Sequence, residues 1–383
     1  MNDMQPLRVG ILTFLHNDNY GSTLQAYALQ RTLRKMGAVV EHLDYTPSPL
    51  EKVKNLVRSG NSPRLLLDSL RRLWVKRGQQ GAQEKAAQFR AFYGEHMRLS
   101  PPCATERALV AQAGQYDCLV AGSDQIWSPT WLNRVYFLPF ASGAVRKVAY
   151  APSLGVNRVV NKGKARRMAQ WLRSFDRLSV REAQGAAILQ QLLQVRPPVM
   201  PDPVMLLSRA EWLDFSEKPQ VSGPYMLCYF IGDAPRYWEQ VERMAMDHGL
   251  QPVVVPVTEE AYAAPYPTLQ GLSPQAWVGA IEGAALVCTD SFHGASFAAM
   301  LGRPFSVILR DAPDDPASRN SRLDQLFQRL GITPGVQPDW EQVRLKHQQL
   351  ALEGKQYLRE AVWGLAEEPA SPADAQGQAA ADL

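Results

Sequence analysis

Residues 284–305, AALVCTDSFHGASFAAMLGRPF, decide the fold because they contain a strand, a turn and a helix in immediate succession. The apolar run 284–288 has the length of a buried strand, and a short helix begins near Ser291 and is closed by Gly302. A second apolar run, Phe305–Leu309, follows directly. Strand, helix and strand in this order indicate parallel strands. The turn between them contains a histidine, although a turn needs glycine or a capping residue rather than an imidazole.

The same alternation of strands and helices occurs throughout the chain. Near the N-terminus, the strand-like runs Val9–Phe14 and Ala38–Tyr45 flank an amphipathic helix at Ser22–Met36. Further strands are expected at Tyr116–Ala121, Lys147–Tyr150, Arg177–Val180, Tyr225–Ile231 and Pro252–Val257, and further helices at Tyr237–His248 and after Ser273-Pro274. This pattern predicts an α/β protein in which helices cover both faces of parallel sheets.

The chain has 383 residues, which is too long for one ordinary core and fits two domains. We predict α/β domains at residues 1–205 and 206–368, joined near Asp202–Pro224. A last helix is expected at about Trp340–Leu365. The tail 369–383 is rich in alanine, proline and aspartate, and this composition predicts disorder.

The composition excludes several classes of protein. The formal net charge of +4 is mild and no nucleic-acid-binding signature is present, so we expect no nucleic-acid partner. The four cysteines are far apart and form no CxxC pair, which argues against a metal site and predicts buried, reduced thiols. No apolar run is long enough to span a membrane, and the N-terminus lacks a signal-peptide pattern. We therefore expect a cytoplasmic protein.

Polar residues gather where strands of the N-terminal half end, which is where parallel α/β sheets bind ligands. The stretch HNDNYGS (16–22) contains one glycine and no GxGxxG pattern, so a dinucleotide site is poorly supported. The stretch AGSDQIW (121–127) follows another strand and presents a carboxylate at Asp124. That carboxylate either faces a ligand or caps a helix, and both interpretations stay open.

A second group of residues predicts an anion pocket with a proton donor. Arg181 follows a strand and offers a forked donor to a carboxylate or phosphate, with a structural salt bridge as the alternative. The helix that begins near Ser291 points free N–H groups toward the same edge, and Gly294 allows close approach of a ligand. His293 can carry a proton there, and Arg310 ends the next strand. The set suits a small substrate with two acidic groups.

Several motifs resemble the polysaccharide pyruvyl transferase family and occur in the family's order over about residues 7–335. They are TFLHNDNYGSTLQAYALQ (13–30), YDCLVAGSDQIW (116–127), LSVREAQG (178–185), PDPVMLL (201–207), TDSFHGASFAAMLGRPF (289–305) and NSRLDQLFQRLGI (320–332). The chain differs at 151–155, where APSLG replaces a frequent Ala-Ser-Phe-Gly, and at Ser128, where the family often has asparagine. Both differences fall where an acceptor would bind.

The resemblance implies two Rossmann-like domains facing across a cleft, as in GT-B glycosyltransferases. It implies a ketal pyruvyltransferase that moves pyruvate from phosphoenolpyruvate to hydroxyls of a sugar, in a lipid-linked precursor of a cell-surface polysaccharide, and releases phosphate. Phosphoenolpyruvate is then a substrate, and no cofactor or metal is expected. The alternative is a nucleotide-sugar glycosyltransferase of the same fold. A non-catalytic, carbohydrate-binding relative is disfavoured because Arg181 and His293, which match the family's donor-handling positions, are intact.

These expectations give each candidate residue a role. The N-terminal domain is the expected acceptor side and the C-terminal domain the expected phosphoenolpyruvate side. The predicted catalytic residues are His293 and Asp124; the predicted donor-binding residues are Arg181, Arg310, Ser291 and Gly294; and the predicted acceptor-binding residues are Asn19, Tyr20 and Gln125.

A basic, helical insertion at 51–98 interrupts the first predicted domain. Its segment 62–77, SPRLLLDSLRRLWVKR, has an apolar stripe of leucines and a tryptophan beside five basic residues. Such a helix either packs on its own domain or lies on an anionic membrane surface. Because family members often act on lipid-linked saccharides, the second interpretation predicts weak peripheral contact with the inner face of the membrane.

Overall fold

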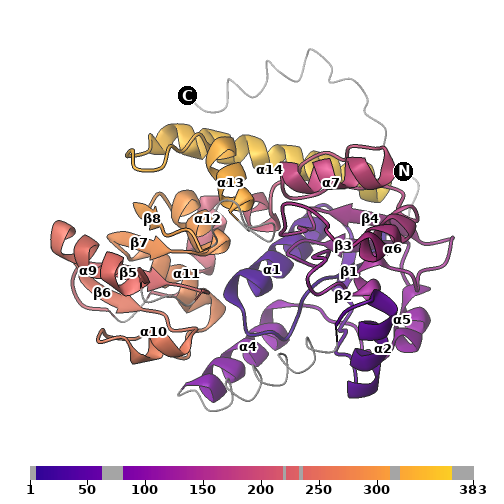
Figure 1. Ribbon diagram of the computed structural model, residues 1–383, viewed down its shortest axis with the longest axis horizontal. Helices are drawn as coiled ribbons and strands as arrows, with labels where there is room; N and C mark the ends of the chain where they lie inside the picture. Colours follow the sequence, from indigo (N-terminus) through magenta and orange to yellow (C-terminus); the bar gives the residue numbers. More distant parts are fainter. Residues whose placement is uncertain (1–5, 63–80, 219–220, 233–235, 311–319, 365–383) are drawn as a thin grey trace.

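The structure is a computed structural model that describes residues 6–62, 81–218, 221–232, 236–310 and 320–364. Two parallel sheets lie side by side, one in each half of the chain (Figure 1). The N-terminal sheet has the order β2-β1-β3-β4, and its strands are β1 (Arg8–Leu12), β2 (Val39–His42), β3 (Cys118–Gly122) and β4 (Arg146–Tyr150). The C-terminal sheet has the order β6-β5-β7-β8, and its strands are β5 (Tyr225–Tyr229), β6 (Gln251–Val254), β7 (Leu286–Thr289) and β8 (Phe305–Val307).

The two sheets have the same topology, because the first strand of each pairs with the second on one side and with the third on the other. All of these pairings are parallel. The crossover connections contain helices, as parallel strands require. The predicted pair of Rossmann-like domains is therefore confirmed.

Most of the helices begin at polar side-chain caps, although those that begin at Ala82, Ala183 and Ser321 have none among the described residues. In the N-terminal half they are α1 (Tyr20–Lys35), α2 (Pro49–Ser59), α4 (Ala82–His96), α5 (Glu106–Ala113), α6 (Lys162–Leu172) and α7 (Ala183–Leu193), with the 3₁₀ helices η1 (Arg134–Phe137) and η2 (Pro203–Leu206). In the C-terminal half they are α8 (Arg209–Phe215), α9 (Arg236–His248), α10 (Glu259–Ala263), α11 (Pro274–Glu282), α12 (Phe292–Leu301), α13 (Ser321–Leu330) and α14 (Trp340–Trp363). The expected start at Ser273-Pro274 is confirmed, since the Ser273 side chain caps α11.

The segment Arg177–Val180, predicted as a strand, forms only single bridges. Arg177 bridges Val148 of β4, and Val180 bridges Val199. Between them, the Ser179 hydroxyl donates to the Ala149 carbonyl (2.8 Å) and accepts from the Ala151 N–H (3.0 Å). Because this side chain occupies backbone groups of the neighbouring segment, a regular ladder does not continue there.

The last helix, α14, crosses from the C-terminal domain back over the N-terminal sheet (Figure 1). The Tyr357 hydroxyl donates to the Ala149 carbonyl of β4 (3.0 Å). A Cβ added at Gly354 would lie 2.5 Å from the Tyr150 hydroxyl, so the backbone of α14 packs directly on that ring. Sequence analysis assigned this helix to the second domain, whereas its C-terminal half packs on the first.

The two domains meet through a continuous cluster of buried side chains contributed by α1, α4, α11 and α12. The Tyr20 ring stacks on the Trp277 ring with centroids 5.3 Å apart and an interplanar angle of 6°. The Tyr20 hydroxyl also donates to the Leu272 carbonyl (3.1 Å). These contacts place the N-terminus of α1 against the first turn of α11.

The remaining expectations from the sequence concern the basic segment, the C-terminal tail, the cysteines and membrane-spanning helices. The basic segment 62–77, apart from Ser62, and the tail 369–383 lie outside the described residues. All four cysteines are buried and unpaired, as predicted. Within the described ranges, no helix is long and apolar enough to cross a membrane.

Candidate active site

His293 lies in the first turn of α12, in the interface between the two domains, and is only 6% exposed. Ser291 caps this helix by accepting from the Gly294 N–H (3.3 Å). On one side, the imidazole touches α1 so closely that a Cβ at Gly21 would lie 2.1 Å from its Nδ1 atom. On the other side, its Nε2 atom lies 3.4 Å from a carboxylate oxygen of Asp202. The ring is therefore held between two segments of the N-terminal half.

Arg181 reaches the same carboxylate from the loop before α7, and it is 4% exposed. Its Nη1 atom donates to Asp202 Oδ2, and its Nη2 atom lies 3.9 Å from Asp124 Oδ1. The guanidinium lies over the Phe292 ring, 4.6 Å from its centroid. Its Nε and Nη2 atoms are buried and make no hydrogen bond to any described residue. One edge of the guanidinium is thus held by Asp202, and the other makes no hydrogen bond to a described residue.

The Asp202 carboxylate is the negative charge at the centre of the site. Burial alone would raise its pKa, but His293 and Arg181 beside it hold the pKa well below its ordinary value. The same pairing raises the pKa of Arg181, against the effect of its burial. At neutral pH, the site therefore contains a buried carboxylate ion with a guanidinium ion bound to it.

Arg322, in the first turn of α13, is a site residue that sequence reasoning missed. Its guanidinium lies on the Phe292 ring at 5.9 Å from the centroid, so it shares that ring with Arg181. Burial, together with the positive charge of Arg181, lowers the pKa of Arg322 to about 9. Its Nε atom is buried, with no hydrogen-bond partner in the described part of the chain. One feature of the sequence could have identified Arg322 as a site residue. It lies in the NSRLDQLFQRLGI motif, at the start of a helix, where an arginine is not needed for capping.

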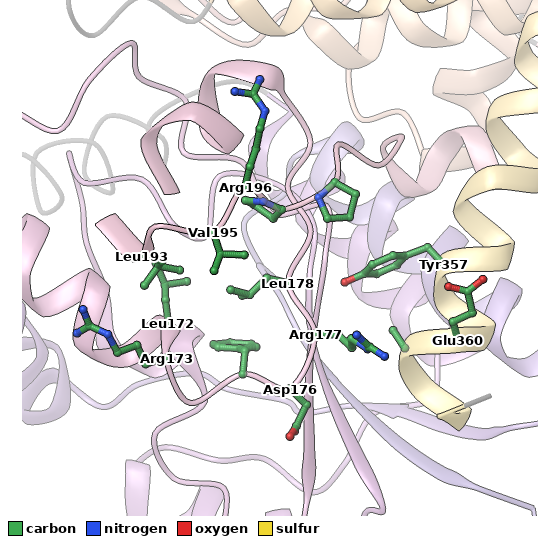
Figure 2. Close-up of a pocket in the computed structure, with 14 residues that line it drawn as sticks. Leu172, Arg173, Asp176, Arg177, Leu178, Leu193, Val195, Arg196, Tyr357 and Glu360 are labelled. Carbon is green, nitrogen blue, oxygen red and sulfur yellow. The ribbon is translucent and has the colours of Figure 1, made fainter. Parts of the chain in front are cut away.

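The space between these groups is small. Arg181, Asp202, Phe292 and Arg322 line a cavity of about 30 Å³, which has room for about one water molecule. A larger cavity of about 550 Å³ lies between the ends of α6, α7 and α14, and Figure 2 shows its lining. None of the candidate site residues lines that cavity.

The other predicted donor-binding residues have partners of their own. The Arg310 side chain donates to the Asp290 carboxylate through Nε (3.0 Å) and to the Asp290 carbonyl through Nη2 (3.2 Å). Asp290 also accepts from the Ile231 and Gly232 N–H groups (2.7 Å each), so it holds the loop after β5 and does not contact the imidazole. Gly294 packs closely on Thr289, not on an open space: a Cβ added at Gly294 would lie 2.6 Å from Thr289 Oγ1.

The predicted acceptor-binding residues fall into two places. Asn19 caps α1 by accepting from the Ser22 N–H (3.0 Å), and Tyr20 is buried in the domain interface. Asp124 and Gln125 lie in the turn after β3, beside Arg181. Asp124 has a φ of 65° and accepts from the Gln125 N–H (2.8 Å), and the turn continues without a helix, so Asp124 caps none. Of the predicted set, Arg181, His293 and Asp124 are therefore brought together. Asn19 caps a helix, Tyr20 packs in the domain interface, and Arg310 is ion-paired with Asp290.

This architecture, with two parallel Rossmann-like domains meeting at a shared polar site, is that of the GT-B type. The model of the polysaccharide pyruvyl transferase family matches residues 19–311, which is more than half of the chain. The protein therefore belongs to the polysaccharide pyruvyl transferase family. No curated protein sequence matches the chain.

Two solved structures have a similar fold. One is a putative UDP-N-acetylglucosamine 2-epimerase from Listeria monocytogenes, with 10% identity, a TM-score of 0.50, and coverage of 94% of this chain and 92% of that chain. The other is S. aureus MnaA, solved with UDP, with 8% identity, a TM-score of 0.50, and coverage of 95% of this chain and 99% of that chain. At these identities, the likeness concerns the fold alone.

Proposed function

We propose that the protein is a ketal pyruvyltransferase that uses phosphoenolpyruvate as donor and hydroxyls of a sugar as acceptor. The observation that carries this proposal is a set of buried nitrogen atoms that make no hydrogen bond to the described residues: Nε and Nη2 of Arg181, Nε of Arg322 and Nε2 of His293. Two of them lie near a carboxylate without a hydrogen bond to it, since Arg181 Nη2 is 3.9 Å from Asp124 and His293 Nε2 is 3.4 Å from Asp202. Unpaired buried donors are costly, and they suit an anionic ligand that pairs with them. The family assignment supports pyruvyl transfer.

The chemistry assigned to these residues begins with a proton. His293 donates a proton to the terminal CH₂ of phosphoenolpyruvate, which leaves an oxocarbenium-like centre at the adjacent carbon. A sugar hydroxyl adds to that carbon and loses its proton. Phosphate then leaves, a second hydroxyl adds in its place, and its proton returns to the solvent or to the imidazole. The products are a cyclic pyruvate ketal and phosphate.

The charged groups have distinct roles in this scheme. Arg181 binds the carboxylate or the phosphate of the donor through its free edge, because a guanidinium offers two parallel N–H groups to such an anion. Arg322 adds a second positive charge beside the Phe292 ring. Asp124, 3.9 Å from Arg181, is placed to accept a proton from the attacking hydroxyl. Arg310 holds the loop around Asp290 and supplies further positive charge to the site.

The acceptor proposed is a sugar of a lipid-linked polysaccharide precursor, used on the cytoplasmic side of the membrane. Weak contact of the basic segment 62–77 with anionic lipid is part of this proposal. Flotation with liposomes that contain or lack anionic lipid, at low and high salt, tests it. Equal recovery in the unbound fraction under every condition would remove the membrane contact and leave the enzymatic proposal intact.

The enzymatic proposal is tested by incubating the protein with phosphoenolpyruvate and a panel of galactosides, mannosides and glucosides. Release of phosphate together with a pyruvate-sized gain in the mass of the sugar is expected. A His293→Gln variant should lower turnover by about 10²–10⁴-fold, which is the usual contribution of a general acid. Transfer of a sugar from a UDP- or GDP-sugar, with no use of phosphoenolpyruvate, would favour the glycosyltransferase alternative instead.

A further inference from the structure

The Asp202 carboxylate is fully buried, and its two oxygens have different partners. Oδ1 accepts from the Val204 N–H (3.1 Å) and so caps η2. Oδ2 accepts from Arg181 Nη1 and from the Ser123 hydroxyl (3.4 Å), and it lies 3.4 Å from His293 Nε2. A cap requires only the first oxygen. The second therefore has a separate task, which is to join two groups of the site.

The groups joined by this oxygen come from different domains. Arg181 and Asp202 belong to the N-terminal half, whereas His293 belongs to α12 of the C-terminal half. The contact between Asp202 and His293 thus spans the interface, and it forms only when the two domains are docked as they are here. Because the carboxylate has no exposed surface, its charge is screened little by solvent, and it raises the pKa of Arg181 against the effect of burial.

The charges around His293 can be named element by element. Asp202 is the nearest, from the start of η2. Arg181 and Glu182 lie before α7, Asp124 follows β3, and Arg322 is at the start of α13, all within electrostatic reach of one another. The segment of α1 that touches the ring contributes Gly21, which has no charge. Asp202 is therefore the negative group best placed to stabilise a protonated imidazole.

We propose that Asp202 is the positioning residue of this site: its inner oxygen, beside His293 Nε2, favours the protonated imidazole and fixes the orientation of the ring, and it fixes one edge of Arg181 so that the opposite edge meets the donor anion. The proposal rests on the proposed function, because it assigns His293 the role of proton donor. It adds a residue whose contribution acts through its neighbours rather than by contact with the substrate.

The test is an Asp202→Asn variant, which removes the charge and keeps a side-chain oxygen for the cap of η2. The matched control is Asp339→Asn at the cap of α14, where the carboxylate also accepts from backbone N–H groups but lies at an exposed helix start. With phosphoenolpyruvate and an accepted sugar, we expect kcat of the Asp202 variant to fall about tenfold or more. We also expect the alkaline limb of its pH–rate profile to move to lower pH by about one unit or more. The Asp339→Asn control should match the wild type in kcat and in the position of the alkaline limb.

A second measurement does not depend on turnover. NMR titration of the imidazole signals, with the His293 signal assigned by its loss in His293→Gln, should give a lower midpoint in Asp202→Asn than in the wild type. An unchanged midpoint and an unmoved alkaline limb in a folded variant would overturn the proposal and leave Asp202 as a cap only. If the wild type does not use phosphoenolpyruvate, the proposed function fails, while the NMR comparison still decides whether Asp202 sets the charge of His293. Asp202→Ser, a smaller capping side chain, replaces the asparagine variant if that variant does not fold.

Discussion

Gly21, at the N-terminus of α1, lies in direct contact with the His293 ring, and an added Cβ would lie 2.1 Å from Nδ1 and 2.3 Å from Cγ. No real Cβ approaches another atom this closely, so any side chain at this position must displace the imidazole or separate the domains. We therefore expect Gly21→Ala to lower turnover by about as much as His293→Gln, or 10²–10⁴-fold. Steady-state kinetics of the two variants, side by side, measures this.

A glycine that lacks such a neighbour provides the control for that experiment. Gly94 lies in α4 with no atom within 4 Å of an added Cβ. In an exposed helix, replacing glycine by alanine usually stabilises the protein by about 0.5–1 kcal/mol. Gly94→Ala should therefore keep full turnover and unfold at the same or a higher temperature. Normal turnover of Gly21→Ala would show that the contact with His293 is not needed for activity.

Arg181→Lys should separate the structural and the ligand-binding roles of this residue. A lysine retains a positive charge beside the buried Asp202 carboxylate, which protects the fold, but it lacks the forked donor. We expect the affinity for phosphoenolpyruvate, measured by calorimetry, to fall by roughly 1.5–3 kcal/mol, the size of one charge-assisted hydrogen bond. Unchanged affinity would place the donor elsewhere.

Arg322→Gln is expected to weaken donor binding without loss of stability. Since the described residues offer no hydrogen-bond partner to its Nε atom, the substitution leaves no protein group newly unpaired there. It also removes the repulsion from Arg181 that helps to lower the pKa of Arg322 to about 9. Calorimetry should show weaker binding of phosphoenolpyruvate, with an unfolding temperature equal to or above that of the wild type. A lower unfolding temperature with unchanged affinity would assign Arg322 to the fold.

Asp124→Asn tests whether the carboxylate in the turn after β3 takes part in the reaction. Asparagine tolerates the left-handed backbone found here and can accept the same hydrogen bond from the Gln125 N–H. The variant should therefore fold normally. We expect turnover to fall by about 10²–10⁴-fold if the carboxylate accepts the hydroxyl proton. Full activity with normal stability would restrict Asp124 to shaping the turn.

The buried histidine His42 makes the stability of the fold depend on pH. Burial lowers the pKa of His42 to about 4 from its ordinary value of 6.5, and its Nε2 atom donates to the Ala26 carbonyl (3.1 Å). The unfolded chain takes up a proton first as the pH falls, so folding is disfavoured between pH 6.5 and about 4. This group should lower the free energy of unfolding by about 3 kcal/mol over that range. Denaturant unfolding at several pH values should show a smaller loss in His42→Gln.

Local patterns in the sequence determined the elements of this fold. The apolar run 284–288 overlaps the strand Leu286–Thr289, and the helix predicted at Ser22–Met36 extends over Tyr20–Lys35. Hydrophobic period, caps and terminal glycines act over a few residues, and a single sequence contains all of that information. The same patterns placed His293 in the turn region after a strand, and Arg181 after the segment 177–180, which forms only single bridges in the structure.

Tertiary structure decided how these elements come together. Nothing local in the sequence connects Asp202 with His293, because their contact depends on how the two domains dock. The same holds for Arg310, whose partner is Asp290, and for the crossing of α14 onto the N-terminal sheet. Contacts between distant residues depend on packing of whole surfaces, and the missing side chain of Gly21 is what lets the imidazole reach the buried carboxylate. The sequence by itself determined which groups could carry the chemistry, and the docking of the two domains determined which of them share one site.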